Sequence, residues 1–420
     1  MTRMTVSGAR PPAASKGTAK TASKKTASKK TASKKTASQK TASKTTTTTK
    51  KTTASKGPLL FGPGVAVTLS LPVQRPDGLD LSPDGDVVVC DGISAGVVRA
   101  LDGGSGAERW AQRLEGTPTG ARYSPDGARI AVSSLHGHIA VLDAATGEVL
   151  GVHRVDTAPR GDLAWSPRGT RVLSVHGHTR ASVAIVDRDG REMRNVEMPH
   201  RVGSAAFIDE SRVLAGHFQS NVFVFDIDAL QTVEDFARPT FEIGVAAGPG
   251  HLALTHDHGH LLLRTHSGGA LPDNTALRAS NKSVVEERLE RNALRLAKER
   301  NTSTQHMLSG EEARAKAAWR KPIAPVGWQP WLPLPHGQIQ KLRFVDDTRL
   351  LLCDGRDASL VTCGPVVSER LLVAVQPMPG VPPRLADVAV RGARAAVSVD
   401  SSNMRLASAI YLLAIDDGAG

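Results

Sequence analysis

The sequence lacks several features by which whole classes of protein are recognised. It holds only three cysteines among 420 residues, Cys90, Cys353 and Cys363, and none lies in a CxxC pair. This number and spacing exclude a disulfide framework and a cysteine-rich metal site, and they suit a reducing compartment. No stretch approaches the roughly 18 apolar residues that span a bilayer. The first residues also lack the apolar segment of a secretory signal, so we expect a soluble, cytoplasmic protein.

The sequence also lacks the short motifs that mark common enzyme sites. It has no P-loop, no GxSxG elbow, no HExxH pair and no dinucleotide-binding fingerprint. We therefore expect no enzymatic activity and no cofactor. Aromatic residues make up only 4% of the chain, whereas 39 glycines and 25 prolines are present. That composition is typical of many short strands joined by tight turns.

Acidic residues are absent from residues 1–57, which hold two arginines and thirteen lysines and so carry a charge of +15. The other 363 residues hold 38 basic and 41 acidic side chains, a charge of −3. Within the basic segment, residues 21–44 contain five copies of a TASKK-like pentapeptide. Almost no apolar side chain is available there to offset the entropy of ordering, so we expect residues 1–57 to be a disordered tail.

The lysine-rich segment is the candidate site for binding polyanions. Its composition resembles the tails of linker histones and of some bacterial nucleoid proteins. Flexible lysines bind phosphates by releasing counterions and do not read sequence, so non-specific DNA or RNA is the implied partner. Binding to anionic membranes and a purely solubilising tail are the alternatives, and DNA binding implies association with a nucleoid or chromatin. The candidate residues are Lys24, Lys25, Lys29, Lys30, Lys34, Lys35, Lys40 and Lys44.

A longer repeat dominates the rest of the chain. Ser-Pro-Asp-Gly occurs at 82–85 and 124–127 and Ser-Pro-Arg-Gly at 166–169, two steps of 42 residues. Each copy predicts a tight turn, because proline fixes φ and glycine accepts a positive φ. Two apolar strands and the start of a fourth strand follow each turn, and a period near 42 with four strands is typical of a propeller blade. Weaker copies around 205–214, 246–250, 342–351 and 388–392 bring the total to seven.

We therefore predict an all-β fold for residues 58–420, a seven-bladed β-propeller. The repeats resemble those of WD40 and YVTN-type propellers, and the segments LDGGSGAERW (101–110) and LDAATGEVL (142–150) are similar to repeats of quinoprotein-type propellers. The Trp-Asp dipeptide of WD40 repeats is absent, which favours the YVTN type. The resemblance implies a fold and leaves the function open. We expect a monomeric scaffold that binds an unidentified partner protein.

The ends of the repeat region indicate how the ring closes. The last copy stops after its third strand, at 408–415, and an unused strand at 65–71 precedes the first copy. Pairing of these two segments would complete the seventh blade and cover an exposed sheet edge, which is the usual closure in the resembled family.

An insertion interrupts the fifth blade. Between Phe207 and Phe344 the chain holds about 53 residues more than two repeats require, and we place them at 273–325, between the third and fourth strands. Four apolar residues there, Val285, Leu289, Ala293 and Leu296, have helical spacing and predict a helix over about 283–300. A capping box at 309–312 predicts a second helix that reaches Arg320. Docking of this hairpin on the propeller is the favoured arrangement, and a partner-binding face is the alternative.

Histidines gather in the turns between second and third strands, where Asp91, Asp354 and Asp400 also fall. Such turns share one rim of a propeller, so a metal- or ligand-binding rim, serving a sensor or an enzyme, is the alternative function. The strongest local candidates are His256, His258 and His260, although polar turn residues beside glycines explain the pattern without a metal. A calcium-loop likeness that begins at Asp80 is a coincidence, because sister repeats place Arg122 and Ala164 there.

Overall fold

The computed structural model describes residues 59–416, apart from gaps at 74–75, 92–95, 156–158, 177–181, 218–220, 237–243, 257–259, 268, 272, 299–327, 334–338, 340, 364–366, 376–383 and 401–407. The lysine-rich segment and the second predicted helix of the insertion lie outside the described residues. In the part of the chain that is described, no helix is long and apolar enough to cross a membrane.

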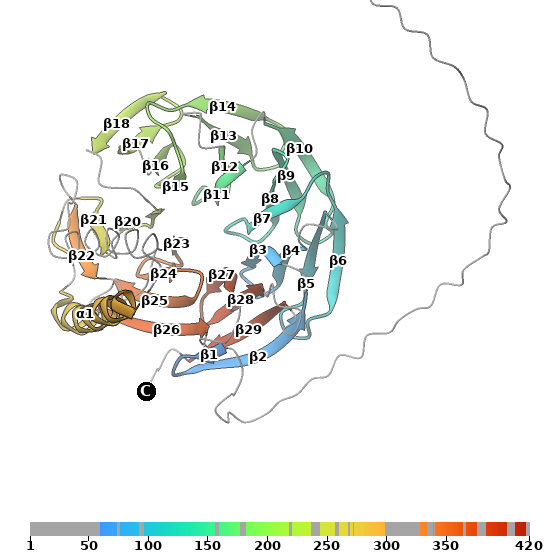
Figure 1. Ribbon diagram of the computed structural model, residues 1–420. Coiled ribbons are helices and arrows are strands. Elements are labelled where there is room, and N and C mark those ends of the chain that lie inside the picture. The colour runs from blue at the N-terminus through green and yellow to red at the C-terminus, as the bar shows by residue number, and fades with distance from the viewer. Residues whose placement is uncertain are drawn as a thin grey trace, which may run out of the picture. The chain divides into compact units, whose positions relative to one another are not determined.

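The described strands form seven antiparallel sheets placed as blades around a common centre (Figure 1). Blades one to three each hold four consecutive strands: β3 (Pro76–Leu81), β4 (Val87–Asp91), β5 (Val97–Leu101) and β6 (Glu108–Arg113); β7 (Pro118–Tyr123), β8 (Arg129–Ser134), β9 (His138–Asp143) and β10 (Val149–Arg154); β11 (Pro159–Trp165), β12 (Arg171–His176), β13 (Ser182–Asp187) and β14 (Met193–Glu197).

Blades four and five follow the same plan: β15 (Ser204–Phe207), β16 (Arg212–Gly216), β17 (Val222–Asp226) and β18 (Gln231–Phe236); β19 (Val245–Ala247), β20 (His251–His256), β21 (His260–Thr265) and β22 (Gln329–Pro333). Blade six contains β23 (Lys341–Phe344), β24 (Arg349–Cys353), β25 (Asp357–Cys363) and β26 (Val367–Val375), with β1 (Leu59–Phe61) as a fifth strand. Blade seven contains β27 (Arg384–Arg391), β28 (Arg394–Asp400), β29 (Ala409–Ile415) and β2 (Val65–Pro72). The predicted seven-bladed propeller is confirmed.

The Ser-Pro-Asp-Gly repeat closes the hairpin between the first and second strands of a blade. Gly127 has a φ of 75°, and its N–H donates to the carbonyl of Ser124 at 2.9 Å. The Ser124 hydroxyl accepts a hydrogen bond from the Arg129 N–H, also at 2.9 Å. Gly85 and Gly169 repeat the positive φ in the neighbouring blades. The serine and the glycine of the motif are thus fixed by backbone geometry.

The predicted closure is confirmed, because β2 pairs antiparallel with β29 and runs from Val65 opposite Ile415 to Pro72 opposite Ala409. An additional strand that the repeat pattern does not predict, β1, pairs with the outer edge of β26 in the neighbouring blade. Gly62 joins the two strands, and a Cβ atom there would lie 1.7 Å from the Leu371 carbonyl oxygen. Residues 59–72 therefore cover the outer edges of two neighbouring blades, and Gly62 permits the close crossing between them.

The core consists of the layers between facing blades. Between blades one and two, for example, Val88 and Cys90 pack against Tyr123 and Ile130, all of them buried. Six further apolar clusters fill the other interfaces. Each blade thus depends on both of its neighbours for a covered face.

The insertion between β21 and β22 contains α1 (Thr275–Lys298), which begins eight residues earlier than the predicted helix. Its first turns contact β22 and β26, where Leu277 packs against the core of blades five and six. Asn281 is buried and donates from Nδ2 to Glu369 Oε2 at 2.9 Å. These contacts stabilise the N-terminal turns of the helix. They involve residues that precede the predicted apolar face, so the helical spacing of that face did not predict them. The side chains of the predicted apolar face lie outside those that the structure describes.

Candidate functional site

A candidate site is a central cavity of 1510 Å³. The first strands of blades two to seven line it, and they surround the centre in Figure 1. Its wall also includes turns that follow these strands, among them Pro125, Pro167 and Pro249, so the cavity reaches one rim of the propeller. A cavity of this size exceeds the range of about 300 to 1,000 Å³ that small-molecule sites occupy.

Asp387 is the most deeply buried charged group in the cavity wall, with 1% of its surface exposed. Its Oδ1 accepts the Val388 N–H at 2.8 Å and forms an ion pair with Lys341 of blade six. Its Oδ2 accepts the Leu79 N–H at 3.0 Å and lies 3.5 Å from Arg122 Nη1. Burial opposes ionisation, but the ammonium of Lys341 and the guanidinium of Arg122 outweigh it and hold the pKa of Asp387 below its ordinary value.

Asp80 in blade one is a second buried carboxylate and has an exposed fraction of 3%. Its Oδ2 accepts the Tyr123 N–H of blade two at 2.9 Å. Its Oδ1 lies 3.2 Å from Arg343 Nη1 of blade six. This carboxylate therefore links blade one to blades two and six.

Arg122 of blade two contacts both blade one and blade three. Its Nη1 donates to the Leu79 carbonyl at 3.0 Å, and its own carbonyl accepts a hydrogen bond from Trp165 Nε1 at 2.9 Å. Arg391, at the end of β27, also lines the cavity. Burial lowers the pKa of Arg391, while Asp80 raises it and Arg343 lowers it further. We call these six residues the inner belt: Asp80, Arg122, Lys341, Arg343, Asp387 and Arg391.

The inner belt carries four cations and two carboxylates. The motifs and repeats of the sequence did not predict this site. A signal was present, because Asp80, Arg122 and Arg343 occupy one position of the repeat, two residues before the turn or its equivalent. Other copies of the repeat carry alanine at that position, Ala164 and Ala206. The turn therefore does not require a charged residue there, and the charged residues in the three copies indicate another role.

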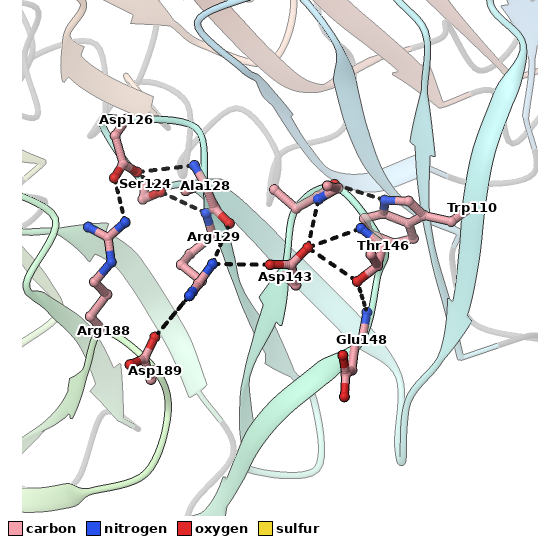
Figure 2. Close-up of polar contacts among 12 residues, drawn as sticks. Trp110, Ser124, Asp126, Ala128, Arg129, Asp143, Thr146, Glu148, Arg188 and Asp189 are labelled. Carbon is pink, nitrogen blue, oxygen red and sulfur yellow. Dashed lines mark hydrogen bonds and ion pairs between the residues drawn. The ribbon is translucent and has the colours of Figure 1, made fainter.

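A second group of ion pairs lies toward the rim, between blades two and three (Figure 2). Arg129 Nη1 lies 3.1 Å from Asp143 Oδ2 in its own blade, and its Nη2 lies 3.2 Å from Asp189 Oδ1 in the next. Arg188 of blade three forms a further ion pair with Asp126 of blade two. We call these five residues the rim ion pairs. Between blades three and four, Arg171 and Asp228 form a similar pair at 2.8 Å.

The carboxylates of the rim ion pairs are more exposed than those of the inner belt. Burial opposes ionisation of Asp126, yet hydrogen bonds from Ser124, Arg188 and the Ala128 N–H together outweigh it and lower its pKa to about 2. In the same region Trp110 Nε1 of blade one donates to the Ala144 carbonyl of blade two at 2.9 Å. Such contacts fix the angle between blades and need no ligand to explain them.

The histidine turns do not converge within the described residues. His256 lies opposite His260 at the end of the β20–β21 hairpin, and His260 is buried. His258 lies outside the described residues. Across the described part of the chain, no group of three histidine, cysteine, aspartate or glutamate side chains is placed to hold a metal ion.

The three cysteines are buried and free. Burial raises the pKa of Cys353 and of Cys363 to about 12, and it raises that of Cys90 as well. A thiol with such a pKa stays protonated at neutral pH and is a poor nucleophile. The cysteines therefore act as small apolar core residues.

Comparison with known proteins identifies the fold and leaves the family open. A family model described as PQQ_2, outer membrane protein assembly factor BamB, matches residues 84–271, a span that includes both quinoprotein-like segments. No curated protein matches. A solved structure titled "Crystal Structure of Mitotic Checkpoint Complex" aligns with a TM-score of 0.53 and 13% identity, covering 88% of this chain and 96% of that chain. The chain is therefore a seven-bladed β-propeller with a BamB-like repeat region.

Proposed function

We propose that this protein is a non-enzymatic scaffold whose propeller binds a partner protein while its lysine-rich segment tethers it to DNA, RNA or another polyanion. One observation carries the proposal: residues 1–57 hold a charge of +15, whereas the remaining 363 residues hold −3. A segment of that charge gains entropy by releasing counterions from a polyanion, and the nearly neutral propeller does not. The two functions thus belong to separate parts of the chain.

The propeller supports the partner-binding half of the proposal. Seven blades present two rims of short turns on a rigid core, and binding residues are often carried by loops on such frameworks. The matched family model is described as an assembly factor, and the matched solved structure is titled as a complex. We extend that type of role, assembly with other proteins, to this chain. We further propose that it acts as a monomer in the cytoplasm, close to the polyanion that its tail binds.

The test replaces charge without shortening the chain. In one variant the eight candidate lysines become glutamine, and in a matched control the same eight become arginine. Binding to unrelated DNA and RNA fragments is measured across a range of salt concentrations. We expect the wild type and the arginine control to bind alike, with a log-log salt slope of up to about −0.9 per neutralised phosphate of duplex DNA. The glutamine variant should lose most of this binding.

Two results would contradict the tether. One is equal binding by the glutamine variant and the wild type. The other is wild-type binding that does not weaken with salt. The partner-binding half is tested separately, by affinity capture from nuclease-treated extract, where the wild type and the glutamine variant should retain the same protein. A capture that disappears with nuclease treatment would mean that nucleic acid alone bridges the two proteins.

A further inference from the structure

The inner belt has more positive charge than its own carboxylates neutralise. Arg122 and Lys341 both pair with Asp387, and Arg343 pairs with Asp80. Among the described residues, no carboxylate forms an ion pair with Arg391. The belt thus holds four cations and two carboxylates, a net charge of +2, and all of its residues except Asp80 line the cavity.

Asp387 has little capacity left for further donors. Asp387 accepts two backbone N–H groups in addition to its two cations. Asp80 accepts the Tyr123 N–H together with the guanidinium of Arg343. The four acceptor positions of Asp387 are thus in use, whereas Asp80 attracts Arg391 electrostatically but forms no ion pair with it among the described residues.

Other acidic residues in the cavity wall have polar partners outside the inner belt, either in their own turn or, for Glu210, in the turn of blade three. Asp209 pairs with Arg212 at 2.7 Å, and Asp346 pairs with Arg349 at 2.6 Å. Glu210 accepts the Arg168 N–H at 2.6 Å. Asp347 is exposed at the mouth, where water screens its charge. These groups do not neutralise the belt.

We propose that the central cavity binds a small dianion, a phosphate or a dicarboxylate, through Arg391 together with Arg343 of the inner belt. A guanidinium presents its donors in a fork that matches carboxylate and phosphate oxygens, and partial burial strengthens the attraction. Like charge at Arg343 and Arg391 disfavours the cavity without an anion, and a dianion between them removes that repulsion. The cavity opens through its turns at the rim, which gives a small anion access.

The experiment uses the full chain and two probes, inorganic phosphate and succinate, near pH 7.5 with ionic strength held constant by sodium chloride. Binding is measured by equilibrium dialysis and by the rise in Tm with probe concentration. We expect Arg391→Gln to weaken binding at least about tenfold, because hydrogen bonds to charged groups are among the strongest single contacts. Arg391→Lys, which retains the charge, should recover part of the binding.

The matched control is Arg191→Gln, which removes the same charge from an exposed position outside the cavity wall. It should bind both probes like the wild type. The lysine-rich segment is identical in all of these proteins, so any anion it takes up cancels in the comparison. Binding of either probe that depends on Arg391 supports the site and shows which oxyanion it prefers. Failure of the wild type to bind both probes, or equal binding by Arg391→Gln, would overturn the proposal; Arg391→Met serves if the glutamine variant does not fold.

Discussion

The inner belt and the rim ion pairs join blades with the same kinds of side chain in two different environments. At the rim, Arg129 and Asp189 are partly exposed and can exchange their partner for water. At the centre, Asp387 has almost no contact with water, so its cations must stay in place. The difference shows that an ion pair between blades adds little stability at the rim, whereas in the belt the loss of one partner leaves an uncompensated buried charge.

The largest effect is expected when the belt loses a carboxylate. Asp387→Asn leaves Lys341 and Arg122 without their shared counter-charge and should lower the free energy of unfolding by about 3 to 5 kcal/mol. Urea denaturation measures this change. Asp126→Asn at the rim is the matched control, with an expected loss below about 1 kcal/mol. Similar losses in the two variants would remove the distinction between the two regions.

Acid should act on the belt next. The folded-state pKa of Asp387 lies below its ordinary value of 3.8, so its ionisation stabilises the fold above that pH, and the contribution is lost as the pH falls through the folded pKa. Tm is measured from about pH 6 downward for the wild type and Asp387→Asn. Below about pH 4 the variant should lose stability less steeply than the wild type. Parallel profiles would show that Asp387 does not ionise differently in the folded and unfolded states.

The smallest effect is expected at the rim. A double-mutant cycle of Arg129→Gln and Asp189→Asn should give a coupling energy of about 0.2 to 1 kcal/mol, as for other exposed pairs. This coupling should decrease when sodium chloride rises from about 0.05 to 0.5 M, because exposed charges are screened. A larger coupling energy that does not change with salt would show that the rim pair is as well shielded from water as the ion pairs of the inner belt.

The sequence was sufficient to predict most of the fold. The turn motif recurs at 42-residue steps because each copy closes the hairpin between the first two strands of a blade. The pairing of β2 with β29 could be predicted because the last copy of the repeat lacks a fourth strand. The strand β1 was missed because Leu59, Leu60 and Phe61 form too short an apolar run to show a period. The early start of α1 was missed because contacts of Asn281 and Leu277 with other blades fix it.

The candidate site was harder to predict than the fold. Asp387 belongs to blade seven, yet its partners Leu79, Arg122 and Lys341 come from blades one, two and six. No local sequence pattern indicates that such distant residues are in contact. The copy of the repeat near Asp387 lacks the Ser-Pro-Asp-Gly motif, so the position of Asp387 within its blade could not be assigned from the sequence. The histidine pattern, by contrast, was conspicuous in the sequence, but the described turns do not bring its members together.

The crossing at Gly62 has a consequence for how the chain is made. Residues 59–72 complete blades six and seven, and the hydrogen bond from Thr68 to the Leu412 carbonyl joins residues 344 positions apart. During synthesis these early strands therefore emerge long before their partners and must wait for almost the whole propeller to be translated. Blades one to five can pair within themselves as they leave the ribosome, whereas β1 must wait for β26 and β2 must wait for β29. Ring closure in this protein therefore cannot precede the synthesis of β29.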